Sequence, residues 1–152
     1  MRLGRLKLRP GRPIRWTNGQ TTEGASAVPP KVLICDNEAI LRTLVRAALE
    51  EDGYDLHEAR DGDESLELTR RLEPDLIVLD MMMPGRTGLE VLTELRSERR
   101  FAETPVIMLT ARVQAGDRAA AEKAGVDHFV SKPFSPVELG ALAERLLAAA
   151  AR

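Results

Sequence analysis

The stretch that decides the fold is LIVLD, residues 76–80. Four consecutive apolar residues, with β-branched residues at their centre, are typical of a strand buried on both faces of a parallel sheet. The run ends at the carboxylate of Asp80, and open α/β sheets bind their ligands at the carboxyl ends of the strands. An aspartate in this place can also be an ordinary turn cap. The choice depends on whether the chain brings polar partners to the same edge.

Further apolar segments alternate with helical patterns along the chain. Strands are expected at Lys31–Cys35, Tyr54–Ala59, Leu76–Asp80, Pro105–Leu109 and Val126–Ser131. Helices are expected at Glu38–Leu49, from Asp61 through about Leu72, from Thr87 through Leu95, at about Val113–Ala124 and from Ser135 to the C-terminus. This alternation predicts an α/β fold, a doubly wound five-stranded parallel sheet of flavodoxin-like order 2-1-3-4-5.

Local signals support the helix ends. Thr87 and Ser135 are each followed three residues later by glutamate, which predicts two capping boxes. In the first helix, apolar residues recur at helical spacing and predict an amphipathic helix: Ile40, Leu41, Leu44, Val45, Ala48 and Leu49. In the last helix, the apolar face expected to pack in the core comprises Val137, Leu139, Leu142, Leu146 and Leu147.

The composition is that of one globular domain with a tail, since 43% of the 152 residues are apolar and 30% are charged. No apolar run approaches the ~20 residues that span a bilayer, and the N-terminus lacks a secretory apolar region. The single cysteine, Cys35, lies in an apolar strand and is interpreted as a small buried hydrophobe. These features together favour a cytoplasmic location.

Charge is distributed unevenly along the chain. Residues 1–30 carry six basic residues against Glu23, a net charge of +5, whereas the whole chain carries −2. We expect a basic, disordered extension at 1–30 and a domain at 31–152. The extension is either an arm for nucleic acid or an acidic partner, or a solvated tail or leader. The acidic domain itself does not resemble a nucleic-acid binder.

Polar residues follow four of the five predicted strands. They are Asp36 and Asn37 after the first, Asp80 after the third, Thr110 after the fourth and Lys132 after the fifth. Because parallel strands end at one edge, two carboxylates, a hydroxyl and an ammonium should converge there. Four complementary groups at four strand ends are hard to explain as caps.

This group of side chains has a specific chemistry. Clustered carboxylates repel unless a cation joins them, and oxygen ligands with room for water suit Mg2+. Asp80 is then a candidate nucleophile toward a phosphoryl group, whose charge Lys132 and the metal would neutralise. Thr110 would donate a hydrogen bond to a phosphoryl oxygen and be drawn inward on phosphorylation.

Residues 31–152 resemble a response-regulator receiver domain of two-component signalling. The resemblance rests on four runs: VLICD at 32–36, PDLIVLDMMMPG at 74–85, LTA at 109–111 and KPF at 132–134. It implies that Asp80 accepts a phosphoryl group from a histidine kinase or histidine phosphotransfer protein. It also implies the following roles: Mg2+ held by Asp36, Asp80 and the Met82 carbonyl, Thr110 and Phe129 as switch residues, Lys132 as phosphate-binding lysine, and a cis Lys132–Pro133 bond.

The chain departs from the family at Asn37, where a second acid is usual. A side-chain amide coordinates through oxygen but carries no charge, so we expect Mg2+ binding to be weakened rather than lost. Met82 and Arg112 lie two residues beyond Asp80 and Thr110, and neither readily orients an attacking water. We therefore expect slow self-hydrolysis of the phosphoryl group.

The resulting hypothesis is a stand-alone receiver, a switch rather than an enzyme, whose output partner binds the face formed by about 113–124, 126–131 and the last helix. One alternative is a degenerate receiver that binds proteins without phosphorylation, which only Asn37 supports. An aspartyl-phosphate hydrolase is a second alternative, but such enzymes tend to have a second aspartate where Met82 stands. A nucleic-acid binder using residues 1–30 is the third.

Overall fold

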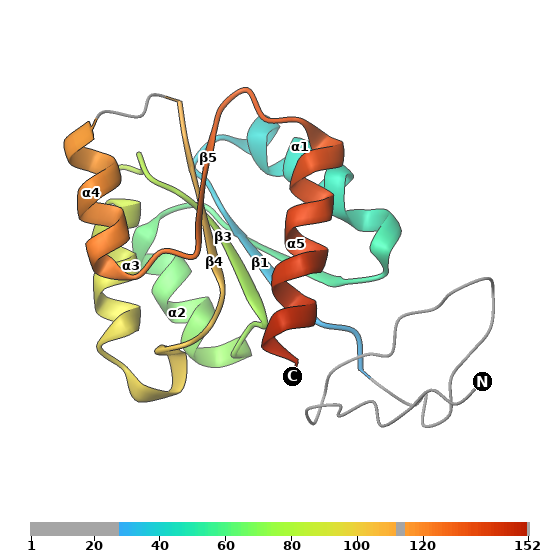
Figure 1. The fold of residues 1–152 in the computed structure, drawn as a ribbon, viewed down its shortest axis with the longest axis horizontal. Coiled ribbons are helices and arrows are strands. Elements are labelled where there is room, and N and C mark those ends of the chain that lie inside the picture. Colours follow the sequence, from blue (N-terminus) through green and yellow to red (C-terminus); the bar gives the residue numbers. More distant parts are fainter. Residues whose placement is uncertain (1–27, 112–114, 152) are drawn as a thin grey trace.

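A parallel sheet with helices on both faces forms the molecule (Figure 1), and the computed structural model describes residues 28–111 and 115–151. The strands are β1 (Lys31–Cys35), β2 (Asp55–Ala59), β3 (Leu76–Asp80), β4 (Val106–Thr110) and β5 (His128–Ser131). The helices are α1 (Ala39–Leu49), α2 (Gly62–Leu72), α3 (Gly88–Arg96), α4 (Ala115–Ala124) and α5 (Pro136–Ala150), with short 3-10 turns at Glu50–Asp52 and Arg99–Phe101.

The strand order is β2-β1-β3-β4-β5 and every pairing is parallel, which confirms the predicted flavodoxin-like arrangement. None of the helices in the described ranges is both long and apolar enough to cross a membrane. Residues 1–27 and Arg112 lie outside the described part of the chain, as does Val113, the predicted start of α4.

Strand β3 is the centre of the structure, because all five of its residues are buried. Its side chains alternate between the two faces of the sheet. Ile77 and Leu79 join the apolar cluster beneath α2, α3 and α4, whereas Leu76 and Val78 join the cluster beneath α1 and α5. The continuous apolar run at 76–79 thus reflects burial on both faces, as predicted.

The helix starts agree with the local sequence signals. Thr87 and Glu90 form the complete predicted capping box at α3. At α5 the Ser135 hydroxyl accepts a hydrogen bond from the Glu138 N–H, which is the N-cap half of the predicted box. Gly53 adopts φ +76°, a left-handed conformation that glycine tolerates, and ends the turn after α1.

Two predictions about buried helix faces were partly wrong. Ile40 and Leu44 of α1 are 74% and 48% exposed, and Val137 of α5 is 81% exposed. Each helix buries a narrower arc than its apolar pattern covers: Val45 and Leu49 in α1, and Leu139, Leu142, Ala143 and Leu147 in α5. Periodicity identifies the apolar arc of a helix, but its neighbours decide how much of that arc is covered.

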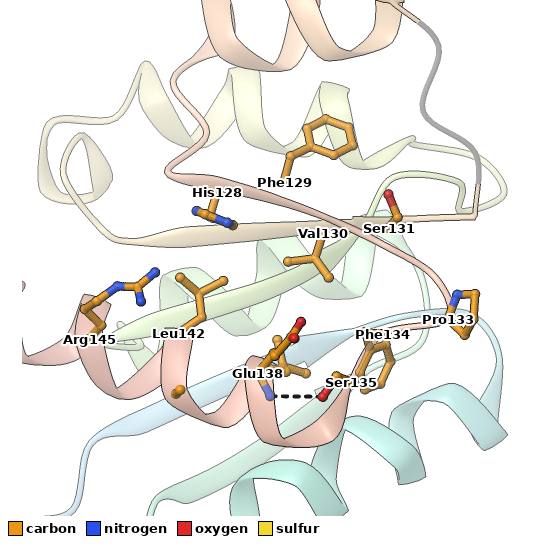
Figure 2. Close-up of a pocket in the computed structure, with 12 residues that line it drawn as sticks. His128, Phe129, Val130, Ser131, Pro133, Phe134, Ser135, Glu138, Leu142 and Arg145 are labelled. Carbon is orange, nitrogen blue, oxygen red and sulfur yellow. Dashed lines mark hydrogen bonds between the residues drawn. The ribbon is translucent and has the colours of Figure 1, made fainter.

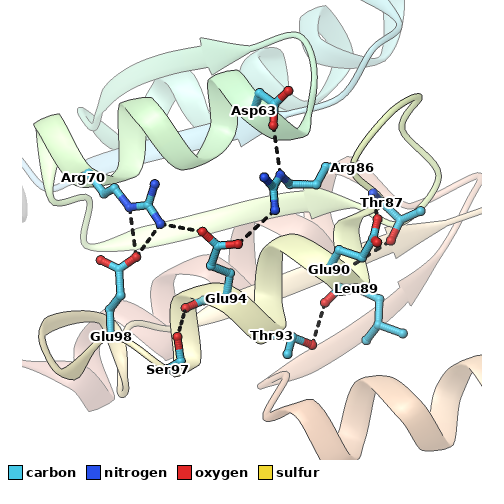
Figure 3. Close-up of polar contacts among 10 residues, drawn as sticks. All are labelled: Asp63, Arg70, Arg86, Thr87, Leu89, Glu90, Thr93, Glu94, Ser97 and Glu98. Carbon is cyan, nitrogen blue, oxygen red and sulfur yellow. Dashed lines mark hydrogen bonds and ion pairs between the residues drawn. The ribbon is translucent and has the colours of Figure 1, made fainter.

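Ion pairs join α2, the β3–α3 loop and α3 on one face (Figure 3). Arg86 of the loop contacts Asp63 and Glu94 at 2.9 Å each, and Arg70 contacts Glu94 at 2.7 Å and Glu98 at 2.6 Å. Because these side chains are partly exposed, each pair contributes little to stability. The network nevertheless ties the loop that follows Asp80 to both neighbouring helices.

The first turn of α3 lies directly against the end of β3. The Gly88 N–H donates to the Met81 carbonyl at 2.9 Å, and a Cβ at Gly88 would overlap the main-chain oxygen of Asp80. Only glycine therefore permits this close approach between the helix and the strand end.

Replacing Gly88 with alanine is expected to lower the free energy of unfolding by about 2 kcal/mol, because main-chain atoms must move to admit the Cβ. The matched control is Gly116→Ala in α4, where nothing lies within 4 Å of the added Cβ. That change should stabilise the helix by about 0.5–1 kcal/mol. Urea denaturation of both variants measures the difference, and equal effects would contradict the packing argument.

Candidate functional site

Three of the predicted polar residues, Asp36, Asp80 and Lys132, meet at the carboxyl edge of the sheet. The Lys132 ammonium lies 3.2 Å from Asp36 Oδ2 and 3.1 Å from Asp80 Oδ1, so one cation bridges the ends of β1 and β3. Asp36, Asp80 and Thr110 are each at most 2% exposed. Residues far apart in sequence thus form one nearly closed polar site.

Each side chain is placed by the sheet itself. Asp36 directly follows β1, and its N–H donates to the Ala59 carbonyl at the end of β2 at 3.1 Å. Its Oδ1 accepts the Glu38 N–H at 2.9 Å, which turns the chain into α1. Asp80 is the last residue of β3, and the following Met81 N–H donates to the Leu109 carbonyl of β4 at 2.8 Å.

Thr110 is the last residue of β4, and Lys132 directly follows β5. The Lys132 N–H donates to the Thr110 carbonyl at 2.7 Å, which continues the β4–β5 pairing to the edge of the sheet. The Lys132–Pro133 peptide bond is cis, as the resemblance implies. The lysine side chain is only 13% exposed, so its ammonium is held among the carboxylates rather than in solvent.

The electrostatics of the site follow from burial and from the charge of the neighbours. Burial raises the pKa of Asp80, the charge of Asp36 adds to this rise, and hydrogen bonds from Lys132 and the Met82 main chain oppose it. Burial alone would lower the pKa of Lys132, but Asp80 and then Asp36 outweigh it and raise that pKa. The site therefore contains a carboxylate that ionises reluctantly and an ammonium that holds its proton.

The donor set fits Mg2+. With both carboxylates ionised, Asp36, Asp80 and Lys132 leave a net charge of −1 in a site that is almost closed to solvent, and their oxygens are ligands that Mg2+ prefers. Across residues 28–111 and 115–151, no three His, Cys, Asp or Glu side chains gather to hold a metal. Further ligands would therefore be amide, main-chain or water oxygens.

Two other predicted site residues lie at the rim. Asn37 is exposed beside Asp36, and the Met82 side chain is 67% exposed.

Cys35 is buried, as predicted, and burial raises the pKa of its thiol to about 12, so the group stays protonated. The sequence interpretation overlooked Arg42, which donates to the main-chain oxygen of Asp36 at 2.8 Å. A lone arginine on a helix gives no signal of such a contact.

Phe129 lies on the same face of the sheet as Thr110. Register pairs Met108 with Phe129 and Thr110 with Ser131, and alternate residues of a strand share a face. Phe129 is half-buried against the core beneath α2, α3 and α4, with the Arg118 guanidinium 5.5 Å from its ring centroid. The two residues that the resemblance implies as switch residues, Thr110 and Phe129, therefore lie on one face of the sheet in neighbouring strands.

A pocket of about 510 Å³ lies between β5 and α5 (Figure 2). The side chains of Val130 and Leu142 face this space; Phe129 also borders the pocket, although its side chain points to the opposite side of β5. The residues that line it are His128, Phe129, Val130, Ser131, Pro133, Phe134, Ser135, Glu138, Leu139, Ala141, Leu142 and Arg145. The part of the predicted output face between β5 and α5 is therefore hollowed.

The sheet order and the placement of the helices define the flavodoxin-like class of α/β proteins. Residues 32–144 match the family of response regulator receiver domains, and the chain belongs to this family. Its members are signalling proteins of two-component systems that interact with histidine kinases and generally bind Mg2+ at their acidic pocket; they are not enzymes in the usual sense.

Curated relatives include the transcriptional regulatory protein ResD of Bacillus subtilis, 42% identical over 109 residues, and the phosphate regulon transcriptional regulatory protein PhoB of Escherichia coli, 39% identical over 109 residues. Each alignment covers 72% of this chain but only 44% and 48% of those proteins, respectively. The chain thus spans about half the length of the curated relatives it matches.

Solved structures agree with this assignment. The Vibrio cholerae chemotaxis protein CheY4 matches with a TM-score of 0.74 and 29% identity, over 78% of this chain and 99% of that one. The receiver domain of the Francisella response regulator 1452 matches with a TM-score of 0.72 and 36% identity, over 78% and 96% of the two chains.

Changing Asp80 to asparagine is expected to raise the free energy of unfolding at pH 7. The pKa of Asp80 is higher in the folded state than in the unfolded state, so the folded state binds this proton more tightly. The contribution of Asp80 to stability therefore falls as pH rises from the ordinary aspartate pKa through the folded pKa. The uncharged amide avoids this loss, and its advantage should shrink toward pH 4.

Urea denaturation between pH 4 and pH 8 measures this effect. The control is Glu67→Gln, an exposed acid on α2, which should change stability by less than about 0.5 kcal/mol throughout. A destabilised Asp80→Asn variant at pH 7 would show that the carboxylate stabilises the fold.

Proposed function

We propose that the chain is a phosphorylation-controlled switch in which Asp80 accepts a phosphoryl group from a histidine kinase or histidine phosphotransfer protein. One observation carries this proposal. The carboxylate at the end of the central strand is buried against Asp36 and bonded to the Lys132 ammonium. Repulsion between two buried acids is costly for the fold alone, but the same arrangement suits the transfer of an anionic group.

In the proposed reaction, a carboxylate oxygen of Asp80 forms a bond to phosphorus as the phosphorus–nitrogen bond of the donor histidine breaks. The electron pair of that bond leaves with the imidazole. Lys132 hydrogen-bonds a phosphoryl oxygen and offsets the added negative charge. Bound Mg2+, held by Asp36, Asp80, Asn37 and the Met82 carbonyl, would supply further neutralisation of the phosphoryl oxygens.

The proposed response to phosphorylation runs along β4 and β5. The Thr110 hydroxyl donates to a phosphoryl oxygen and moves toward Asp80. The Phe129 side chain, on the same face of the sheet, then moves into the space that Thr110 vacates. The partner then binds the face formed by α4, β5 and α5, which includes the pocket in Figure 2. We propose that residues 31–152 form the switching unit and that residues 1–30 are a basic extension. We also propose that the protein is located in the cytoplasm.

The relatives' names favour transcription as the process under control, since both ResD and PhoB are called transcriptional regulatory proteins. For the lifetime of the phosphoryl group, we propose slow self-hydrolysis. Met82 is exposed near Asp80 and its thioether does not orient water well, while Arg112 lies outside the described residues.

The deciding experiment is the intact mass of the full chain after incubation with acetyl phosphate, with and without Mg2+. We expect one added phosphoryl group that requires Mg2+ and is absent from Asp80→Asn. Glu67→Gln should be modified like the wild type. The absence of an adduct at high Mg2+ concentration would instead favour a degenerate receiver that binds its partner unmodified.

Asn37→Asp is expected to tighten Mg2+ binding by about tenfold or more. A unit charge ~4 Å from a divalent ion is worth several kcal/mol at an effective dielectric near 20, before desolvation offsets much of that gain. Titration calorimetry with MgCl2 compares the two chains. Unchanged affinity would show that the amide is no handicap at this site.

A further inference from the structure

Arg42 of α1 contacts the site through the main chain of Asp36 rather than through its carboxylate. One guanidinium nitrogen donates to the main-chain oxygen of Asp36 at 2.8 Å, and Nε donates to Glu58 Oε1 of β2 at 2.9 Å. The Arg42 side chain is 13% exposed, far less than a helix-surface arginine. Its planar fork therefore spans two fixed acceptors at the edge where β1 and β2 end.

Glu58 holds Arg42 in this orientation. Its second oxygen accepts from Arg46 Nε at 2.7 Å, so one carboxylate lies between two arginines that are one helical turn apart. The hydrogen bond from Arg46, followed by that from Arg42, outweighs the opposing effect of burial and lowers the pKa of Glu58. Glu58 thus stays ionised and directs the remaining Arg42 donor toward Asp36.

We propose that Arg42 is a positioning residue, which fixes the main chain of Asp36 so that its carboxylate is oriented for Mg2+. This inference rests on the proposed function, because it concerns the metal that assists phosphorylation. Every polar group of Asp36 has a partner. They are the Ala59 carbonyl for its N–H, Arg42 for its carbonyl, the Glu38 N–H for Oδ1 and Lys132 for Oδ2.

The orientation of Asp36 matters more in this chain because Asn37 brings no charge. Among the described residues, Asp36 is the one carboxylate that the β1–α1 turn places in the buried site, since Glu38 is exposed. A rotated Asp36 would therefore leave Asp80 as the remaining buried carboxylate for the metal. Groups that orient a metal ligand typically affect metal affinity by 10–100-fold.

The sign of the effect separates positioning from simple charge. Removing a positive charge near a cation site strengthens cation binding by Coulomb's law. Losing the hydrogen bond from Arg42 to the Asp36 carbonyl weakens cation binding, because the carboxylate is no longer held in its orientation. Arg42→Gln therefore distinguishes the two, because the charge effect and the positioning effect move the Mg2+ affinity in opposite directions.

The test is titration calorimetry of the full chain with MgCl2. We expect Arg42→Gln to weaken Mg2+ binding about tenfold. Arg46→Gln is the matched control: it loses the same type of ion pair with Glu58 on the same helix, but no contact with Asp36. We expect its affinity to stay within about twofold of the wild type.

Urea denaturation checks that both variants fold. If Arg42→Gln does not fold, Arg42→Lys takes its place, since its single ammonium keeps the charge but cannot serve both acceptors; it should also weaken binding severalfold. Affinity equal to or tighter than that of the wild type in the Arg42 variant overturns the inference. Failure of the wild type to bind Mg2+ overturns both the inference and the proposed magnesium-dependent switch, so the two failures are distinguishable.

Discussion

Two buried carboxylates that share one ammonium are the constraint on which the rest of the structure depends. Asp36 and Asp80 lie almost out of solvent, and Lys132 bonds both. Burial and mutual repulsion disfavour the ionised pair, so the arrangement depends on the bridging ammonium and on the sheet, which fixes its members from three strands. The raised pKa of Asp80 is the signature of this cost. A site of this kind is poised for any event that adds a cation or redistributes the negative charge.

The parallel sheet is what makes such a site possible. In the order β2-β1-β3-β4-β5, the ends of β1 and β3 are neighbours, and β4 and β5 follow on one side. Full burial of β3 on both faces anchors the central aspartate, and the close packing of Gly88 against the end of the strand holds the loop that follows. The ion pairs of Arg86 and Arg70 extend this support to α2 and α3 (Figure 3). The apolar core thus fixes the position of each charged group.

Much of this arrangement could be predicted from the sequence. Strand ends in a parallel sheet share an edge, so Asp36, Asp80, Thr110 and Lys132 could be brought together from alternation alone. The exposure of Ile40 and Val137 could not, because periodicity does not show how much of an apolar arc the neighbouring elements cover. The contact of Arg42 with Asp36 could not either, since it depends on β2 placing Glu58 beside α1. Local patterns predict elements and their order, whereas side-chain partnerships between elements require the packed structure.

The substitution at Asn37 and the contact of Arg42 belong to one physical argument. A metal site with several acids tolerates a misdirected ligand, because the remaining charges hold the ion. In this chain the β1–α1 turn contributes a single buried carboxylate, so in the proposed Mg2+ site its direction would carry a larger share of the binding free energy. The hydrogen bond from the Asp36 N–H to the Ala59 carbonyl of β2 and the one from the Glu38 N–H to Asp36 Oδ1 fix part of that direction, but only the first of them reaches outside the turn. Arg42 adds a rigid link from the carbonyl of Asp36 to Glu58 of β2. By orienting Asp36, it supports the one buried carboxylate of a turn in which Asn37 brings no second charge.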